Sequence, residues 1–238
     1  MESRKLIYSF NLPGEQKEEF VLEYDAKTLE LVSSAEQDLP SWTFLDFNKC
    51  PHCPLKSDDS PRCPLAVSIA GVVRQFQNII SYNEIYLTVE SDERVVTQKT
   101  TAQRALGSFM GVVMAISGCP RTAFFRPMAR FHLPLASEEE TVYRSAAMYL
   151  LAQYFCKSDG NDIDYSLDGL NKIYKSMEIV NTSVVNRLRA ASRADSSVNA
   201  VIMLDMYAKL VPYGIDDSLE DIRYLFSAYL DGNNCTYP

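Results

Sequence analysis

Four of the six cysteines in this 238-residue sequence are followed directly by proline. Proline occupies 11 of the 238 positions, so chance would give only about 0.3 such pairs. The four cysteines are Cys50, Cys53, Cys63 and Cys119. Proline fixes its own φ and keeps the preceding residue out of the helical region, so each thiol is presented from a stiff, non-helical backbone. We therefore predict that these four cysteines are metal ligands.

The spacing of these cysteines predicts one site with four thiolate ligands. Cys50 and Cys53 form a C-x2-C chelate, Cys63 follows after nine intervening residues, and Cys119 comes directly after Gly118. Four thiolates suit tetrahedral Zn²⁺ or an iron–sulfur cluster. Structural zinc is the first hypothesis and a 4Fe-4S cluster is the alternative. Two further interpretations stay open: a dithiol redox site at Cys50 and Cys53, or a surface C-x2-C pair without function and buried neutral cysteines elsewhere.

A second cluster of candidate site residues lies between residues 121 and 134, where no acidic residue occurs. Its members are Arg121, Arg126, Arg130 and His132. Guanidinium groups offer paired donors to carboxylate or phosphate, so the cluster is a candidate anion-binding site. The alternative is structural, because arginines in an acidic chain are often ion-paired, and a histidine between Phe131 and Leu133 is often a core residue.

The overall charge argues against nucleic-acid binding. The chain has 23 Lys and Arg against 31 Asp and Glu, which gives a net charge of −8. Such a chain has no excess of positive charge for the phosphate backbone, so we expect no nucleic-acid partner. The sequence also lacks a glycine-rich nucleotide loop, a nucleophile elbow and an H-E-x-x-H motif. We therefore assign no catalytic residue.

The sequence predicts a cytoplasmic protein without a membrane partner. Its first ten residues lack the apolar segment of a signal peptide. The most apolar stretch, residues 105–118, contains three glycines and is too short to span a bilayer. In a reducing cytoplasm, the cysteines are expected to be thiols or metal ligands rather than disulfides.

Hydrophobic periodicity predicts an α+β fold with N-terminal antiparallel strands, a metal-binding loop and a C-terminal helical bundle. Alternation of apolar and polar residues predicts a three-stranded meander at residues 6–12, 20–24 and 29–32. The same pattern predicts a second hairpin at residues 82–90 and 94–99. Helical spacing predicts two helices among them, at residues 65–80 and about 101–118. The cysteine-rich segment 50–64 is predicted to be a loop.

The C-terminal region is predicted to be helical almost throughout. A capping box, from Ser137 to Glu140, begins a helix that extends to about Cys156. Apolar residues surround most of this helix, which predicts a central position. Further helices are expected at about 167–193, 195–211 and 217–230. We therefore predict an α+β metal-binding region over 1–136 and a helical region over 137–238, or one domain that integrates both.

Four sequence blocks resemble an uncharacterised bacterial family, a domain of unknown function. The blocks are Cys50-Pro-His-Cys-Pro-Leu55, Cys63-Pro-Leu-Ala66, Ser117-Gly-Cys-Pro120 and Arg126-Pro-Met-Ala-Arg-Phe-His-Leu-Pro134. The resemblance spans about residues 43 to 145. The resemblance implies that the four cysteines act as a unit, and it supports Arg130 and His132 as candidate site residues. It implies no activity.

The leading hypothesis is a cytoplasmic bacterial metal-binding protein with a binding or regulatory role. Its structural four-cysteine site would hold segment 119–134 in place to bind an anionic small molecule or a partner protein. The alternative is an enzyme that uses an iron–sulfur cluster or a metal-bound water. In that enzyme His132 would act as acid and base, while Arg126 and Arg130 orient an anionic substrate.

Overall fold

The computed structural model describes residues 2–12, 14, 16–32, 39–76, 81–191, 198 and 219–230. The chain divides into two compact units. The first consists of Met1–Leu135 and Ser176–Met206, and the second of Ala136–Lys175 and Tyr207–Pro238. All four Cys-Pro cysteines belong to the first unit.

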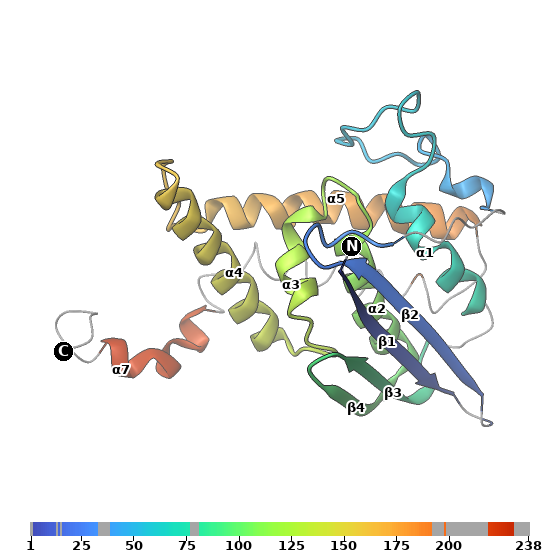
Figure 1. The fold of residues 1–238 in the computed structure, drawn as a ribbon, viewed down its shortest axis with the longest axis horizontal. Helices are drawn as coiled ribbons and strands as arrows, with labels where there is room; N and C mark the ends of the chain where they lie inside the picture. Colours follow the sequence, from blue (N-terminus) through green and yellow to red (C-terminus); the bar gives the residue numbers. More distant parts are fainter. Residues whose placement is uncertain are drawn as a thin grey trace. The chain divides into compact units, whose positions relative to one another are not determined.

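The first unit contains a four-stranded antiparallel sheet of strand order β2-β1-β3-β4 (Figure 1). Its strands are β1 (Ser3–Asn11), β2 (Lys17–Asp25), β3 (Glu84–Ser91) and β4 (Val95–Thr101). β1 pairs with β2 in its hairpin, with Leu6 opposite Leu22, and with β3 on its other side. Alternate residues of β1, including Tyr8 and Phe10, are fully buried, whereas their neighbours are not. The predicted α+β class is confirmed.

The predicted third strand of the N-terminal meander, residues 29–32, is reduced to a single antiparallel bridge with β2. Leu31 forms only an isolated bridge with Tyr24. The chain turns sharply before it, because Asp25 Oδ1 accepts hydrogen bonds from two backbone N–H groups and Leu29 adopts a φ of 55°. The Asp25 N–H donates to the carbonyl of Glu30 and the Val32 N–H to that of Glu23, while the Leu31 N–H points away from β2 and donates to the carbonyl of Ile116. The second hairpin joins the sheet on the other side, where β3 pairs with β1.

Two helices of the first unit pack against the buried face of the sheet. They are α1 (Pro64–Gln75) and α2 (Ala102–Ile116). α2 is buried along most of its length, and Phe109 meets Tyr8 edge to face, with ring centroids 4.9 Å apart. Phe76, just after α1, makes the same kind of contact with Phe10. Aromatic side chains thus form the core that supports the cysteine-bearing segments.

Shorter elements and part of a long helix complete the first unit. The short ones are η1 (Ser41–Thr43), η2 (Ala123–Phe125) and α3 (Arg126–Arg130). The long helix is α5 (Asp168–Ala191), which begins in the second unit and continues into the first at Ser176. It agrees with the helix predicted at 167–193.

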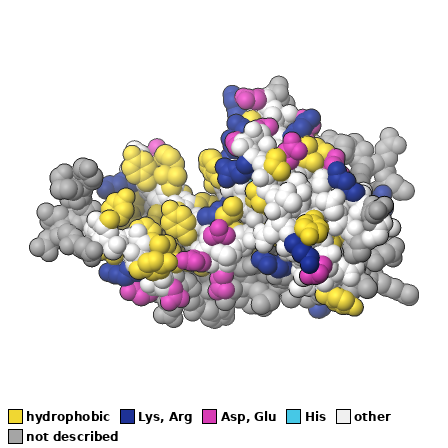
Figure 2. Space-filling view, turned by 90° about the horizontal axis from the view of Figure 1, so that it is seen from below, with side chains coloured by type: hydrophobic (Ala, Val, Ile, Leu, Met, Phe, Trp, Pro, Cys, Tyr) yellow, Lys and Arg dark blue, Asp and Glu magenta, His cyan; other side chains and the backbone are white. Residues whose placement is uncertain are grey.

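The described part of the second unit includes α4 (Glu138–Ser158), the start of α5, η3 (Arg223–Phe226) and α7 (Ser227–Leu230). The capping box that begins α4 is present as predicted. The expected central position of α4 is wrong, because its only buried residues are Val142, Ser145, Ala146 and Tyr149. Several large apolar side chains of this unit are more than half exposed, among them Tyr154 and Phe155, and Figure 2 shows exposed hydrophobic side chains in yellow.

Two further expectations concern the C-terminal region and the membrane. The helix predicted at 195–211 lies outside the described residues except for Val198, and the one predicted at 217–230 is described only from residue 219. Within the described residues, none of the helices has both the length and the apolar character that crossing a membrane requires.

Candidate metal centre and basic pocket

The four predicted ligands, Cys50, Cys53, Cys63 and Cys119, line one small cavity of about 20 Å³, here named the cysteine cavity. Their segments are far apart in the sequence: the loop after η1, the start of α1 and the end of α2. Apolar side chains from the same segments and from α5 form much of the remaining wall, together with Arg121 and Arg187. Cys156, which no proline follows, does not line the cavity.

A tight turn brings Cys50 and Cys53 together. The Cys53 N–H donates to the Cys50 carbonyl at 3.0 Å. Arg121 Nε donates to the carbonyl of His52 at 2.9 Å, which ties this turn to the segment after α2. The His52 ring is hydrogen-bonded through Nε2 to Ser176 Oγ at 2.8 Å and does not line the cavity. The chelate loop is therefore fixed from two sides without its histidine entering the cavity.

Cys63 occupies the position directly before the first turn of α1. Pro64 is the first helical residue, where its missing N–H costs no hydrogen bond, and it keeps Cys63 extended, with φ −73° and ψ 116°. The Cys63 N–H donates to the carbonyl of Thr43 at 2.8 Å. The thiol thus lies at the N-terminus of α1.

Cys119 is presented by the end of α2. Gly118 adopts a φ of +80°, a left-handed conformation that glycine reaches without the penalty of a Cβ and that commonly ends a helix. Ser117 Oγ and Thr122 Oγ1 both donate to the carbonyl of Met114, at 2.8 and 2.6 Å. These two hydrogen bonds hold the residues on each side of Cys119, which is itself only 9% exposed.

The surroundings of the cavity favour the neutral form of two of the four thiols, those of Cys50 and Cys119. Burial raises the pKa of Cys50, and the hydrogen bond with Ser183 and the charge of Arg187 oppose that rise. Burial also raises the pKa of Cys119, against hydrogen bonds from the backbone of residues 121 and 122. The charges of neighbouring cysteines raise both pKa values further. Cys50 therefore interacts electrostatically with Cys53 and Cys63, and Cys119 with Cys50 and Cys63.

Arg187 of α5 is a site residue that sequence reasoning missed. Its side chain is fully buried, with only 2% of the residue exposed. Nη1 donates to the carbonyls of Trp42 and Phe44, both at 2.7 Å, and Nη2 donates to that of Leu45 at 2.8 Å. It forms no ion pair with a carboxylate in the described part of the chain. The sequence could have indicated its burial in one way: Arg187 lies at helical spacing from Val180 and Val184, on the apolar face of α5.

The shared cavity is not a ready-made ligand set. Among the described residues, no three histidine, cysteine, aspartate or glutamate side chains stand in an arrangement that could hold a metal ion. The four cysteines border the same space, but their sulfurs would have to turn toward a common centre to coordinate one. Side-chain rotation about Cα–Cβ is the smallest movement that could achieve this.

The four residues of the predicted anion site lie in three places. Arg130 and His132 line a second cavity of about 130 Å³, here named the basic pocket. Arg121 lines the cysteine cavity instead. Arg126 lines neither cavity, and its Nη2 lies 2.6 Å from Glu30 Oε1 in an ion pair. The four side chains therefore do not converge on one cavity.

His132 has a structural partner inside the first unit. Its Nε2 is hydrogen-bonded to the hydroxyl of Tyr8, which is fully buried. Burial raises the pKa of this tyrosine well above its usual range, against a hydrogen bond with Ser108. His132 lines the basic pocket but not the cysteine cavity.

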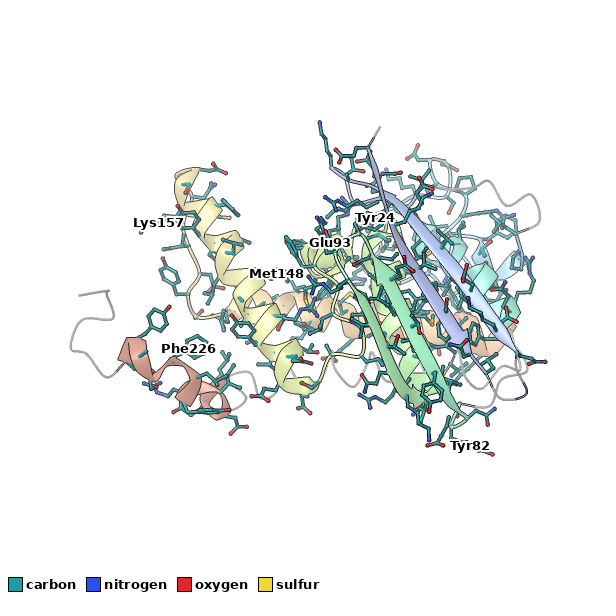
Figure 3. All side chains as sticks on the ribbon, turned by 60° about the horizontal axis from the view of Figure 1, so that its bottom comes forward. Tyr24, Tyr82, Glu93, Met148, Lys157 and Phe226 are labelled. Atoms are coloured by element: carbon teal, nitrogen blue, oxygen red, sulfur yellow. The ribbon has the colours of Figure 1, made fainter. Side chains whose placement is uncertain are left out.

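The basic pocket is framed by the ends of sheet strands. Arg4 and Tyr24, from β1 and β2, and the turn at 91–94 between β3 and β4 line it together with Arg130. Figure 3 labels Tyr24 and Glu93, which lie at the same end of the sheet. Glu93 Oε1 accepts from Arg4 Nη1 at 3.1 Å and from Arg130 Nη2 at 3.2 Å.

One protein-family model matches residues 6–227, and its description is "Domain of unknown function (DUF6901)". The match includes the sheet, the four Cys-Pro cysteines and α5, and it extends well beyond residues 43–145. No curated protein and no solved structure matches the chain.

Proposed function

The chain belongs to this family of unknown function, and we propose that it is a metal-binding protein whose Cys50, Cys53, Cys63 and Cys119 hold one zinc ion. The observation that carries the proposal is that these four Cys-Pro cysteines, from three separate segments, line one small cavity. Zn²⁺ would displace the thiol protons and draw the four sulfurs toward a common centre.

Charge balance around Arg187 supports a metal–thiolate site. A buried cation is stable only when an opposite charge or a full set of acceptors compensates it. Arg187 has three neutral carbonyl acceptors and no carboxylate partner among the described residues. Four thiolates around Zn²⁺ carry a net charge of about −2. Arg187 and Arg121, which both line the cavity, would neutralise that charge.

The size of the cavity favours a single ion over an iron–sulfur cluster. A cavity needs at least about 10–15 Å³ to hold one water molecule. At about 20 Å³, the cysteine cavity offers space for one atom of that size. A 4Fe-4S cluster would bring four irons and four sulfides into the same space. Zinc therefore fits this cavity with less displacement of its walls.

The proposed role of the zinc is structural. Four protein ligands leave no open position for a substrate or a water, which is typical of structural zinc sites. The ion would link the loop before α1, the start of α1 and the segment that follows α2. That segment leads to Arg130 and His132, so zinc would hold in place a surface that binds an anionic small molecule or a partner protein. Reduced thiolates suit the reducing bacterial cytoplasm, where we propose that the protein acts.

Metal analysis of matched cysteine variants tests the proposal. Protein is purified without oxygen, and zinc, iron and sulfide are quantified together with the visible spectrum. We expect one zinc per chain and no visible absorption for the wild type and for Cys156→Ser, because Cys156 does not line the cavity. Cys63→Ser is expected to lose both zinc and thermal stability, because structural metal binding contributes folding free energy.

Two results would contradict the zinc site. Full zinc content in Cys63→Ser would remove this cysteine from the ligand set. Stoichiometric iron and sulfide with broad visible absorption would replace zinc by a cluster and favour the enzyme alternative.

A further inference from the structure

The basic pocket concentrates positive charge on a chain whose net charge is −8. Its lining includes four cationic side chains, from Arg4, Lys5, Arg94 and Arg130, and two carboxylates, from Asp92 and Glu93. The excess of two positive charges suits a dianion. The pocket shares no lining residue with the cysteine cavity, so binding at the pocket can be tested separately from zinc binding.

Two guanidinium groups already converge on one point of this pocket. Arg4 extends from β1 and Arg130 from the end of α3, and their side chains are only 27% and 23% exposed. Both donate to the same atom, Glu93 Oε1, at 3.1 and 3.2 Å. Two arginines that share one anionic oxygen have the spacing needed to bind an oxyanion, since guanidinium donors match the oxygens of phosphate.

Tyr24 adds a hydroxyl to the same pocket. This residue is 3% exposed and lines the pocket. Burial raises the pKa of Tyr24, the charges of Arg130 and Arg4 lower it, and those of Glu93 and Asp92 raise it. The hydroxyl therefore lies within electrostatic reach of all four charged groups. A tyrosine hydroxyl can donate one hydrogen bond, which a ligand oxygen in the pocket would accept.

Glu93 occupies the position that a ligand oxygen would take. Its side chain is 44% exposed on the short turn between β3 and β4, so it can move outward without disturbing the core. Burial acts to raise the pKa of Glu93, but the hydrogen bond from Arg130 and the charges of Arg130 and Arg4 outweigh it and keep the pKa below its usual value. The carboxylate that fills the pocket is thus ionised and displaceable.

We propose that the basic pocket binds a dianionic phosphoryl group, from inorganic phosphate or from a small phosphomonoester, and that Glu93 takes its place in the unliganded protein. Arg4 and Arg130 hold the phosphoryl oxygens and the Tyr24 hydroxyl donates to one of them. The cavity of about 130 Å³ is several times the roughly 10–15 Å³ that one water requires, so a tetrahedral oxyanion fits. This inference rests on the proposed function, in which the segment that carries Arg130 binds an anionic small molecule, and it names the class of that anion; it can fail while the zinc site stands, because the two cavities share no lining residue.

Isothermal titration calorimetry on the full-length protein tests this proposal, with inorganic phosphate and glycerol 3-phosphate as probes. We expect saturable binding at one site per chain. Arg130→Gln should weaken binding about 10- to 100-fold, the usual effect of losing a hydrogen bond to a charged group. Glu93→Gln should strengthen it about 3- to 10-fold, because the competing carboxylate charge is removed. Tighter binding of glycerol 3-phosphate than of phosphate would identify a phosphomonoester as the ligand, and the reverse would identify free phosphate.

Arg126→Gln is the matched control, because Arg126 belongs to the same short helix but lines neither cavity. It should bind both probes as the wild type does. Arg130→Lys, which keeps the charge but loses the planar donor pair, should give intermediate affinity if Arg130→Gln does not fold. The absence of saturable binding with both probes, equal losses in the Arg126 and Arg130 variants, or weaker binding by Glu93→Gln would each overturn the proposal.

Discussion

Replacing Arg187 with methionine removes a buried cation and leaves three buried carbonyls, those of Trp42, Phe44 and Leu45, without their donor. A hydrogen bond to a charged group contributes about 1.5–3 kcal/mol, and removing the guanidinium also ends its own desolvation cost. Breaking buried charged networks typically costs about 3–5 kcal/mol, and we expect a loss of this size in the free energy of unfolding. Urea denaturation followed by circular dichroism measures it. Zinc content should fall as well, because the loop that carries Cys50 loses its anchor.

Arg189→Met is the control for this prediction, because Arg189 is exposed on the same helix two residues later. We expect its free energy of unfolding to stay within about 0.5 kcal/mol of the wild type. Arg187→Lys retains the charge, but one ammonium cannot reproduce the planar fork, so its stability should lie between those of the wild type and Arg187→Met. Equal stabilities and equal zinc contents in the Arg187→Met and Arg189→Met variants would refute the role given to the buried guanidinium.

Three further predictions concern backbone strain, acid sensitivity and the core. In Gly118→Ala the new Cβ has room, but the alanine must adopt a φ of +80°. Urea denaturation should therefore show a free energy of unfolding lower by about 1 kcal/mol, and zinc affinity should fall as well. Unchanged values for both would contradict the positioning of Cys119 by this turn. Hydrogen bonds, first from the Ser166 side chain and then from the Gly169 backbone, hold the pKa of Asp164 below its ordinary value. Because a lowered carboxyl pKa stabilises the fold above the unfolded-state value of about 3.9, that stability should disappear progressively as the pH falls below it. Thermal melts of Asp164→Asn should therefore show a smaller loss of stability on acidification than the wild type, and parallel curves would contradict this. Tyr8→Phe removes the hydroxyl that is hydrogen-bonded to His132 and should lower the free energy of unfolding by about 1–2 kcal/mol. Zinc content should not change, and a loss of zinc would contradict the separation of the two cavities.

Much of the fold could be predicted from local sequence signals. Alternation of apolar residues predicted the strands of both hairpins, and the capping box at Ser137 predicted the start of α4. The expected membership of an uncharacterised domain family is also confirmed. The predicted third strand of the meander did not extend through Leu29, because hydrophobic periodicity does not reveal that a residue in a short apolar run has a positive φ. The predicted central position of α4 was wrong, because apolar residues around a helix do not reveal which of them pack against other elements.

The candidate sites were predictable to different extents. The Cys-Pro pairs singled out four cysteines that border one cavity, because proline acts on the backbone of its own neighbour and needs no tertiary information. The arginines of segment 121–130 could not be assigned in the same way. Arg126 meets Glu30 and Arg130 meets Glu93, and both partners are distant in the sequence. Arg4, Tyr24 and Arg187 acquire their surroundings only through folding.

X-ray absorption at the zinc K edge of the full-length protein, purified without oxygen, tests the four-cysteine site most directly. Four thiolate ligands predict a shell of four sulfurs at about 2.3 Å and no nitrogen or oxygen ligand. A first shell that contains nitrogen or oxygen at about 2.0–2.2 Å, or a protein that contains no zinc, would contradict the proposed site.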